Sequence, residues 1–383
     1  MSKKKIISYL ILNFLVIFSL VIPKTVLSDG PPKPKQWKGK GTIIEFQSVP
    51  SMTIKDFLIG KKPERQVTIS GTLNFPANAP EKNAPVVVLL HGWGGIKDAS
   101  KHWMKVFNSM GLATFMVDSN WARRNCKKDN NFKKAIAFCA GRNKGMNRII
   151  DGYRALELLS KHPRIDPDKI GCLGISLGAR GCLHLNVKRF QKMWGTPGLD
   201  YAASVPMYPA CNVIFKEDDE ITDTPIRIHI GELDTYGSSD SCVNYVERLR
   251  AKGKDVEVKV YPETHHSFEA PVSDGKSGKS KGHSDGKCYY EENSSLPVAE
   301  MAPDDVAIIS QIGFNEWYAT ATKKEKKKVF RNLNGRHKSG WRVPQFQFDN
   351  SCVRKYQILA YNKDSSAEAE KLVREFFTET LMK

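Results

Sequence analysis

The stretch LGISLGARG, residues 173–181, contains the pattern Gly174-Ile175-Ser176-Leu177-Gly178. A Gly-x-Ser-x-Gly match arises by chance in about one chain in ten of this length. Here it directly follows a predicted strand and opens a predicted helix, which is the placement that a strained turn presenting a serine nucleophile requires. The two glycines suit such a turn, because it leaves no room for Cβ atoms two positions on either side of Ser176.

Strand and helix patterns alternate on both sides of this turn. A buried strand without polar alternation is expected at APVVVLLHG, residues 84–92, and an antiparallel pair opens the fold at 42–49 and 66–75. Further strands are predicted over 112–119, 169–174, 202–211, 225–232 and 256–263, and helices over 99–110, 148–161, from Leu177 onward, and over 366–381. This alternation predicts an α/β fold, a mostly parallel sheet with helices on both faces.

A serine hydroxyl needs a base and a group that orients the base, and both follow Ser176 in the chain. IGELDTYG places Asp234 after one strand, and YPETHHSFEAP places His265 and His266 after the next. We favour His266 as the base, because the spacing lets Phe268 pack beneath the loop while His265 faces solvent or braces it. Asp234 lies nearest its strand end and is preferred as the acid.

Two other acids compete with Asp234. Asp240 suits the start of the following helix as a cap or a first-turn charge, and Glu232 is the third candidate. Donors for a developing oxyanion are assigned to the backbone N–H groups of Leu177 and of Trp93 in LLHGWGG, residues 89–95. His91 is interpreted as a structural residue that hydrogen-bonds this turn.

The N-terminal segment has the pattern of an export signal. Lys3, Lys4 and Lys5 precede an uncharged apolar run of 17 residues, 6–22, and small or compact residues precede a cleavage site after Ser28. We therefore predict a signal peptide over 1–28, with an uncleaved anchor as the alternative. A Pro/Gly/Lys spacer over 29–41 leads into the α/β domain, 42–383, and the protein is predicted to be periplasmic or secreted.

The C-terminal part of this domain contains a departure from regular alternation. Residues 273–287 are of low complexity and are predicted to be a mobile loop. A small insert is expected to continue to about residue 350, with helical pieces near 304–311 and 315–331. Because it follows His266, the 273–350 segment is a candidate roof over the site.

Eight cysteines in an exported chain favour disulfides over metal ligands. The pairs that we predict are Cys126–Cys139, Cys211–Cys242 and Cys288–Cys352. Cys172 and Cys182 flank the serine turn on elements expected to be buried, which suits core thiols. No metal or cofactor motif is present, so none is predicted.

The chain is strongly basic, with a net charge of +18 that falls to +14 once the four lysines of residues 1–28 are removed. A lysine-rich solvated surface accounts for much of this charge, and no nucleic-acid-binding motif is present. Residues 120–144 carry eight basic side chains against Asp129 alone. They are a candidate for steering anionic esters or an anionic envelope surface towards the site, with a solvated loop as the alternative.

The motifs HGWGG, GISLGARG, YPAC, GELD and YPETHHSF, in this order, resemble the dienelactone hydrolase family of α/β-hydrolases, particularly its exported members. The resemblance covers about residues 50–270 and the closing helix. It implies an eight-stranded core and hydrolysis of small esters or lactones. The enzymes that name the family use a cysteine nucleophile, whereas this chain has Ser176, which favours a general carboxylesterase.

The sequence therefore predicts an exported serine hydrolase acting on carboxylic esters or lactones through Ser176, His266 and Asp234. One alternative is a peptidase or acyltransferase that uses the same three residues. The other is a non-catalytic protein that binds envelope material on a hydrolase scaffold.

Overall fold

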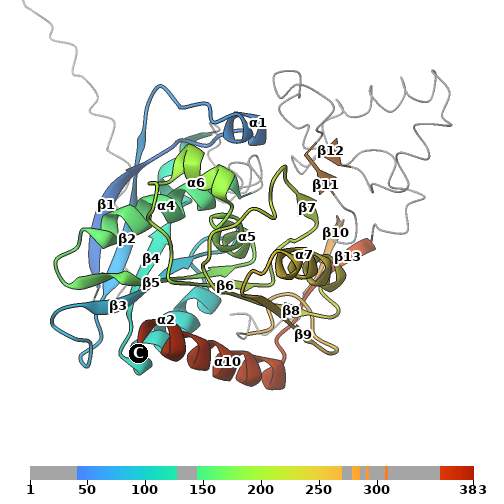
Figure 1. Ribbon diagram of the computed structural model, residues 1–383. Coiled ribbons are helices and arrows are strands. Elements are labelled where there is room, and N and C mark those ends of the chain that lie inside the picture. The colour runs from blue at the N-terminus through green and yellow to red at the C-terminus, as the bar shows by residue number, and fades with distance from the viewer. Residues whose placement is uncertain (1–40, 127–144, 270–277, 285–289, 293–306, 309–353) are drawn as a thin grey trace, which may run out of the picture. The chain divides into compact units, whose positions relative to one another are not determined.

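The computed structural model describes residues 41–126, 145–269, 278–284, 290–292, 307–308 and 354–383 (Figure 1). The predicted signal peptide, the spacer up to residue 40 and most of the 273–350 insert lie outside these ranges. Among the described residues, no helix combines the length and the apolar character needed to cross a membrane.

An eight-stranded sheet forms the centre of the domain, in the order β1-β2-β4-β3-β5-β6-β8-β9. Neighbours from β4 to β9 are parallel, whereas β1–β2 and β2–β4 are antiparallel. The strands are β1 (Thr42–Ser48), β2 (Val67–Asn74), β3 (Ala84–Leu90), β4 (Ala113–Asp118), β5 (Ile165–Ile175), β6 (Ala203–Met207), β8 (Ile226–Gly231) and β9 (Val256–Tyr261). The mostly parallel α/β sheet predicted from the sequence is confirmed.

Helices cover both faces of this sheet, as a buried parallel sheet requires. They are α1 (Ile54–Leu58), α2 (Asp98–Met110), the 3₁₀ turn η1 (Trp121–Cys126), α4 (Met146–Ser160), α5 (Leu177–His184), α6 (Lys188–Trp194), α7 (Ser239–Ala251) and α10 (Lys363–Leu381). Figure 1 shows α2 and α10 together on one face, with α4 and α5 on the other. Every residue of β3 is buried, in agreement with its uninterrupted apolar sequence.

The closing helix α10 buries its apolar face against α2 and the sheet. Its first turn is capped by the Asn362 side chain, which accepts a hydrogen bond from the Ser365 N–H at 3.1 Å. Further along the helix, the Phe377 ring lies edge-on to Phe107 of α2, with 5.1 Å between the ring centroids. The amphipathic closing helix predicted from the sequence is confirmed.

Short strands follow the main sheet, and they correct two predictions. Residues 278–284, inside the segment predicted to be a mobile loop, form β10 (Gly278–Ser284) and pair antiparallel with β13 (Arg354–Leu359). Backbone hydrogen bonds form this pair without an apolar strand pattern. A second small sheet contains β7 (Val213–Ile214), β11 (Tyr290–Glu291) and β12 (Ala307–Ile308), in which β11 pairs parallel with β7 and antiparallel with β12. Residues 307–308 are therefore a strand, whereas a helix over 304–311 was expected.

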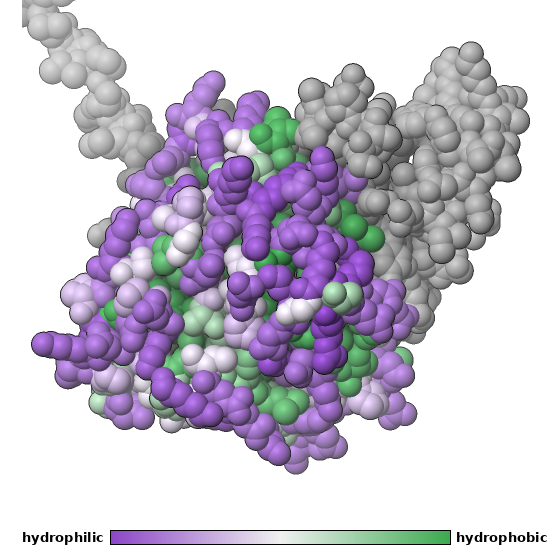
Figure 2. Space-filling model, in the orientation of Figure 1, coloured by the Kyte–Doolittle hydropathy of each residue, from purple (hydrophilic) through white to green (hydrophobic). Residues whose placement is uncertain are grey.

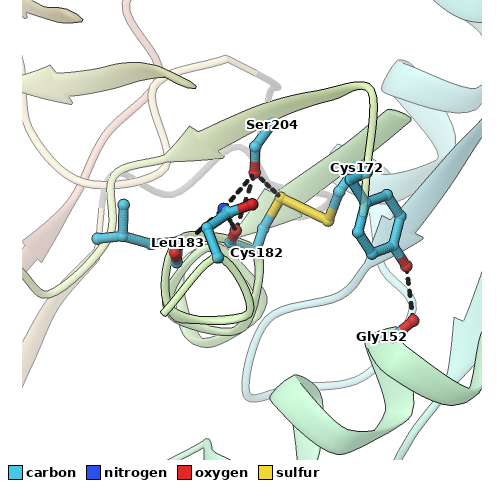
Figure 3. The surroundings of a disulfide bond; sticks show 7 residues. Gly152, Cys172, Cys182, Leu183 and Ser204 are labelled. Carbon is cyan, nitrogen blue, oxygen red and sulfur yellow. Dashed lines mark hydrogen bonds between the residues drawn. A yellow bond between two sulfur atoms is a disulfide. The ribbon is translucent and has the colours of Figure 1, made fainter. Parts of the chain in front are cut away.

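Two disulfides occur among the described residues. The predicted Cys211–Cys242 bond is present and joins the segment after β6 to α7. Cys172 of β5 is bonded to Cys182 of α5 (Figure 3), so the interpretation of these two as core thiols is wrong. The folded chain brings their Cα atoms to 6.1 Å across the serine turn, which sequence spacing does not reveal. Cys139, Cys288 and Cys352 lie outside the described residues.

The described surface is predominantly polar. Figure 2 shows a face covered mainly by hydrophilic residues, with hydrophobic residues in small, separate areas.

Candidate active site

Ser176 occupies the tight turn between β5 and α5. Its backbone has φ 54° and ψ −111°, a region that side-chain-bearing residues rarely adopt. A Cβ atom on Gly174 would lie 2.3 Å from the carbonyl oxygen of Gly178, and one on Gly178 would lie 1.9 Å from that of Leu90. Both distances are impossible for real atoms, so only glycine fits at these two positions, as the sequence pattern indicated.

The structure brings Ser176, His266 and Asp234 into one chain of hydrogen bonds. His266 Nε2 lies 2.9 Å from Ser176 Oγ, and His266 Nδ1 lies 2.7 Å from Asp234 Oδ2. The three residues follow β5, β9 and β8, whose carboxyl ends meet at one edge of the sheet. Groups in this order can withdraw the proton from a serine hydroxyl while the carboxylate fixes the imidazole tautomer.

Asp234 is held by its own turn. Its Oδ1 accepts hydrogen bonds from the N–H groups of Tyr236 at 2.7 Å and Gly237 at 3.1 Å, which leaves Oδ2 directed at His266. The rival acids lie elsewhere. Asp240 is exposed in the first turn of α7, and exposed Glu232 accepts a hydrogen bond from the Glu263 N–H.

The two adjacent histidines have separate positions. His266 is buried between the serine and the acid, whereas His265 Nδ1 contacts the carbonyl oxygen of Leu233 at 3.1 Å and so braces the neighbouring loop. Phe268 is fully buried and packs on Tyr261, with 4.9 Å between ring centroids. This arrangement agrees with the prediction that Phe268 packs beneath the loop while His265 faces solvent or braces it.

The turn after β3 carries Trp93, one of the two predicted oxyanion donors. The carbonyl oxygen of Gly92 accepts hydrogen bonds from His91 Nδ1 at 2.7 Å and from the Gly95 N–H at 3.2 Å. The Gly92 carbonyl and the Trp93 N–H belong to one trans peptide, so they point in opposite directions. The Trp93 N–H therefore points away from the acceptor side of this turn. Leu177 opens α5, where an N–H has no acceptor within its own helix.

His91 has the structural role that the sequence suggested. Its Nε2 accepts a hydrogen bond from the Ser119 N–H at 3.2 Å, so both ring nitrogens are engaged by backbone. Burial lowers the pKa of His91 to about 4, and the positive charge of Arg148 acts in the same direction. The imidazole is therefore neutral at neutral pH, with its proton on Nδ1.

Three residues at the site were not found by sequence reasoning. Tyr236 stacks on the His266 ring and Tyr208 meets it edge-on, each with 4.4 Å between ring centroids. Glu269, also buried, accepts a hydrogen bond from the Tyr208 hydroxyl. Tyr208 lies within YPAC, which was noticed only as part of a resemblance, and Glu269 directly follows HHSF, which was used to choose between the two histidines.

The segment that returns from the insert fixes the histidine loop. The carbonyl oxygens of His266 and Phe268 accept hydrogen bonds from the N–H groups of Ala360 and Asn362, both at 3.1 Å. The Ile358 N–H donates to Thr235 Oγ1 at 3.2 Å, next to Asp234. Residues 358–362 therefore brace two of the three loops that contribute to the hydrogen-bonded chain, those of Asp234 and His266.

Arg123 corrects one part of the steering hypothesis. It is buried, and it makes a paired ion bridge to Asp151 with N–O distances of 2.6 and 2.7 Å. It also donates to the carbonyl oxygens of Val49 and Ser119. Its charge is therefore neutralised inside the fold and does not attract substrates. Most other basic residues of 120–144 lie outside the described residues.

Within the described ranges, no group of His, Cys, Asp and Glu side chains could hold a metal ion. The side chains that the site brings together are a partly exposed serine and a buried imidazole and carboxylate, at the end of a parallel sheet. This combination on an eight-stranded, mostly parallel sheet defines an α/β-hydrolase.

The model of the dienelactone hydrolase family matches residues 69–291, more than half of the chain. The protein belongs to the dienelactone hydrolase family, and its class of reaction is the hydrolysis of carboxylic esters. No curated protein matches the sequence significantly.

Two solved structures are similar to this chain. A dienelactone hydrolase-like promiscuous phosphotriesterase from metagenomic libraries is 14% identical with a TM-score of 0.50, over 89% of this chain and 99% of that one. A thermophilic esterase from the planctomycete Thermogutta terrifontis is 16% identical with a TM-score of 0.42, over 56% of this chain and 86% of that one.

Proposed function

We propose that the protein is an exported serine hydrolase that cleaves carboxylic esters or lactones, with Ser176 as nucleophile, His266 as general base and Asp234 as the orienting acid. One observation carries the proposal: a serine on a strained turn lies 2.9 Å from an imidazole nitrogen whose partner nitrogen lies 2.7 Å from a buried carboxylate. A serine hydroxyl becomes a useful nucleophile in such surroundings.

The reaction has two steps. Ser176 Oγ attacks the ester carbonyl while His266 accepts its proton, and the N–H groups of Leu177 and Trp93 stabilise the oxyanion. The protonated His266 then gives its proton to the leaving alcohol. Water, activated by the same imidazole, releases the acid from Ser176. In a lactone, the leaving hydroxyl stays attached to the released acid.

Exposed apolar side chains beside the proposed site favour substrates with apolar groups. Trp93, whose backbone N–H is a proposed oxyanion donor, is 44% exposed. Leu233, next to Asp234 in the sequence, is 42% exposed. Large apolar residues left in contact with water next to reactive groups are suited to covering part of a ligand. Alkyl or aryl esters are therefore the first substrates to test.

The test is reaction of the mature chain with a fluorophosphonate, followed by mass mapping and turnover of short-chain p-nitrophenyl esters. We expect one label, on Ser176, and loss of both label and turnover in Ser176→Ala. The control Ser160→Ala changes a serine of α4 whose hydroxyl donates to its own helix. Turnover retained by Ser176→Ala would refute the assignment, and a folded chain that takes no label would support the envelope-binding alternative.

Export is supported by the signal-like pattern of residues 1–28 and by two disulfides, which persist in oxidising compartments. We expect the protein isolated from the envelope or medium to begin at Asp29, as N-terminal sequencing can show. A start at Met1 in a membrane fraction would support the anchor alternative.

Steering of anionic substrates or association with an anionic envelope surface is the remaining part of the proposal. It depends on the basic residues of 120–144 other than Arg123. Replacement of these residues by serine is expected to reduce the salt dependence of kcat/KM for an anionic ester. An unchanged salt dependence would remove this part of the proposal.

A further inference from the structure

A buried carboxyl group lies next to the proposed base without taking part in the steps above. Glu269, only 1% exposed, accepts a hydrogen bond from the Tyr208 hydroxyl through Oε1. Its Oε2 is buried with no hydrogen-bond partner in the described part of the chain. A carboxyl group satisfied on one oxygen alone is costly to bury in its ionised form, which points to a use beyond packing.

Tyr208 connects this carboxyl group to His266. The Tyr208 ring meets the imidazole edge-on, with centroids 4.4 Å apart and planes at 63°. Tyr208 has φ 44°, and its N–H donates to the carbonyl oxygen of His229 in β8 at 2.6 Å. The tyrosine is thus fixed at its backbone by the sheet and at its hydroxyl by Glu269, and its ring borders the imidazole.

We propose that Glu269 is a charged positioning residue for His266: through Tyr208 it holds the imidazole, and in its ionised form it favours the positive charge that His266 takes up during the reaction. The inference rests on the proposed function, because it assigns a role relative to the proposed base. It makes the rate of hydrolysis depend on a second carboxylate, separate from Asp234.

The ionisation of Glu269 falls in the working range of an esterase. Burial raises the pKa of Glu269 to about 7, while the hydrogen bond from Tyr208 and attraction to His266 act in the opposite direction. The α10 helix packs against the same segment through the Ser366 hydroxyl, which donates to the carbonyl oxygen of Glu269, and the charged residues around Ser366, namely Lys363, Asp364 and Glu368, are exposed. Glu269 is therefore neutral well below pH 7 and negative well above it.

The first experiment compares kcat and KM of the wild-type full domain and of Glu269→Gln from about pH 5.5 to 8.5. Glutamine keeps an acceptor for the Tyr208 hydroxyl but cannot ionise. We expect kcat to fall about three- to tenfold at the alkaline end, with KM unchanged, and the two proteins to converge at the acid end. The matched control Glu263→Gln removes an exposed charge from the same loop and should follow the wild type throughout.

The second experiment uses Tyr208→Phe, which keeps the ring against His266 and removes the hydroxyl. Because the hydrogen bond lowers the pKa of Glu269, its loss should move the pH at which the rate rises to a higher value. That shift should be absent when Tyr208→Phe is combined with Glu269→Gln.

Two outcomes would overturn the inference. A Glu269→Gln enzyme that equals the wild type at every pH shows that the charge has no effect on His266. A loss of the same factor at every pH shows a role in packing alone. Both require an active wild-type enzyme that is labelled on Ser176, so they are distinguishable from failure of the proposed function itself.

Discussion

The strained backbone at Ser176 can be measured separately from its chemistry. A residue with a side chain at φ 54° and ψ −111° stores about 1 to 3 kcal/mol, and alanine keeps this strain because it keeps the Cβ atom. Glycine relieves the strain but loses about 0.5 to 1 kcal/mol through the greater freedom of the unfolded chain. Both substitutions remove the same hydrogen bond to His266. We therefore expect Ser176→Gly to be more stable than Ser176→Ala by about 1 kcal/mol.

Urea unfolding of the two inactive variants measures this difference directly. The control is the same pair of substitutions at Ser160, the last residue of α4, which has no positive φ, so that glycine should be no more stable than alanine there. If Ser176→Gly were no more stable than Ser176→Ala while the Ser160 pair behaved as expected, the backbone at Ser176 would not be strained and the reasoning would fail.

Three further perturbations follow from the geometry. Gly178→Ala places a Cβ atom 1.9 Å from the carbonyl oxygen of Leu90, so it should destabilise the fold by more than about 2 kcal/mol and abolish turnover; an active variant with wild-type urea midpoint would contradict this. Replacing Cys211 and Cys242 together by alanine frees a loop of 31 residues, which should lower the free energy of unfolding by about 3 to 4 kcal/mol in the same assay. A decrease below about 1 kcal/mol would contradict the loop-closure argument. Stability should fall as the pH drops from about 6.5 towards 4, because folded His91, with its pKa lowered to about 4, accepts a proton less readily than the unfolded chain. His91→Gln should flatten the dependence of the urea midpoint on pH, and an unchanged slope would show that His91 does not cause it.

Much of the fold was predictable from local patterns. The uninterrupted apolar run of β3 and the glycines around Ser176 each report on their own immediate surroundings, so they can be read from the sequence. The chain order of Ser176, Asp234 and His266 was also sufficient to indicate residues that the structure brings together. Their catalytic roles stay predictions until turnover is measured.

What the sequence could not supply were contacts that depend on distant segments. Tyr208 contacts His266 across 58 positions, and the charge of Arg123 is paired with that of Asp151 in α4. Nothing in the sequence distinguishes Tyr208 from a tyrosine of an ordinary loop, or Arg123 from an arginine at the surface. β10 was missed for another reason, because a pair of strands held by backbone hydrogen bonds needs no apolar alternation.

The bracing of the His266 loop by residues 358–362 has a consequence for synthesis. A ribosome produces β5, β8 and β9 long before this segment, so Ser176, Asp234 and His266 all emerge while the residues that hold the Asp234 and His266 loops are still missing. The reactive arrangement is completed only when β13 and α10 have been made. We therefore expect nascent chains to lack this arrangement for most of translation, and a chain that stops before Leu359 to lack the hydrogen bonds that hold the histidine loop.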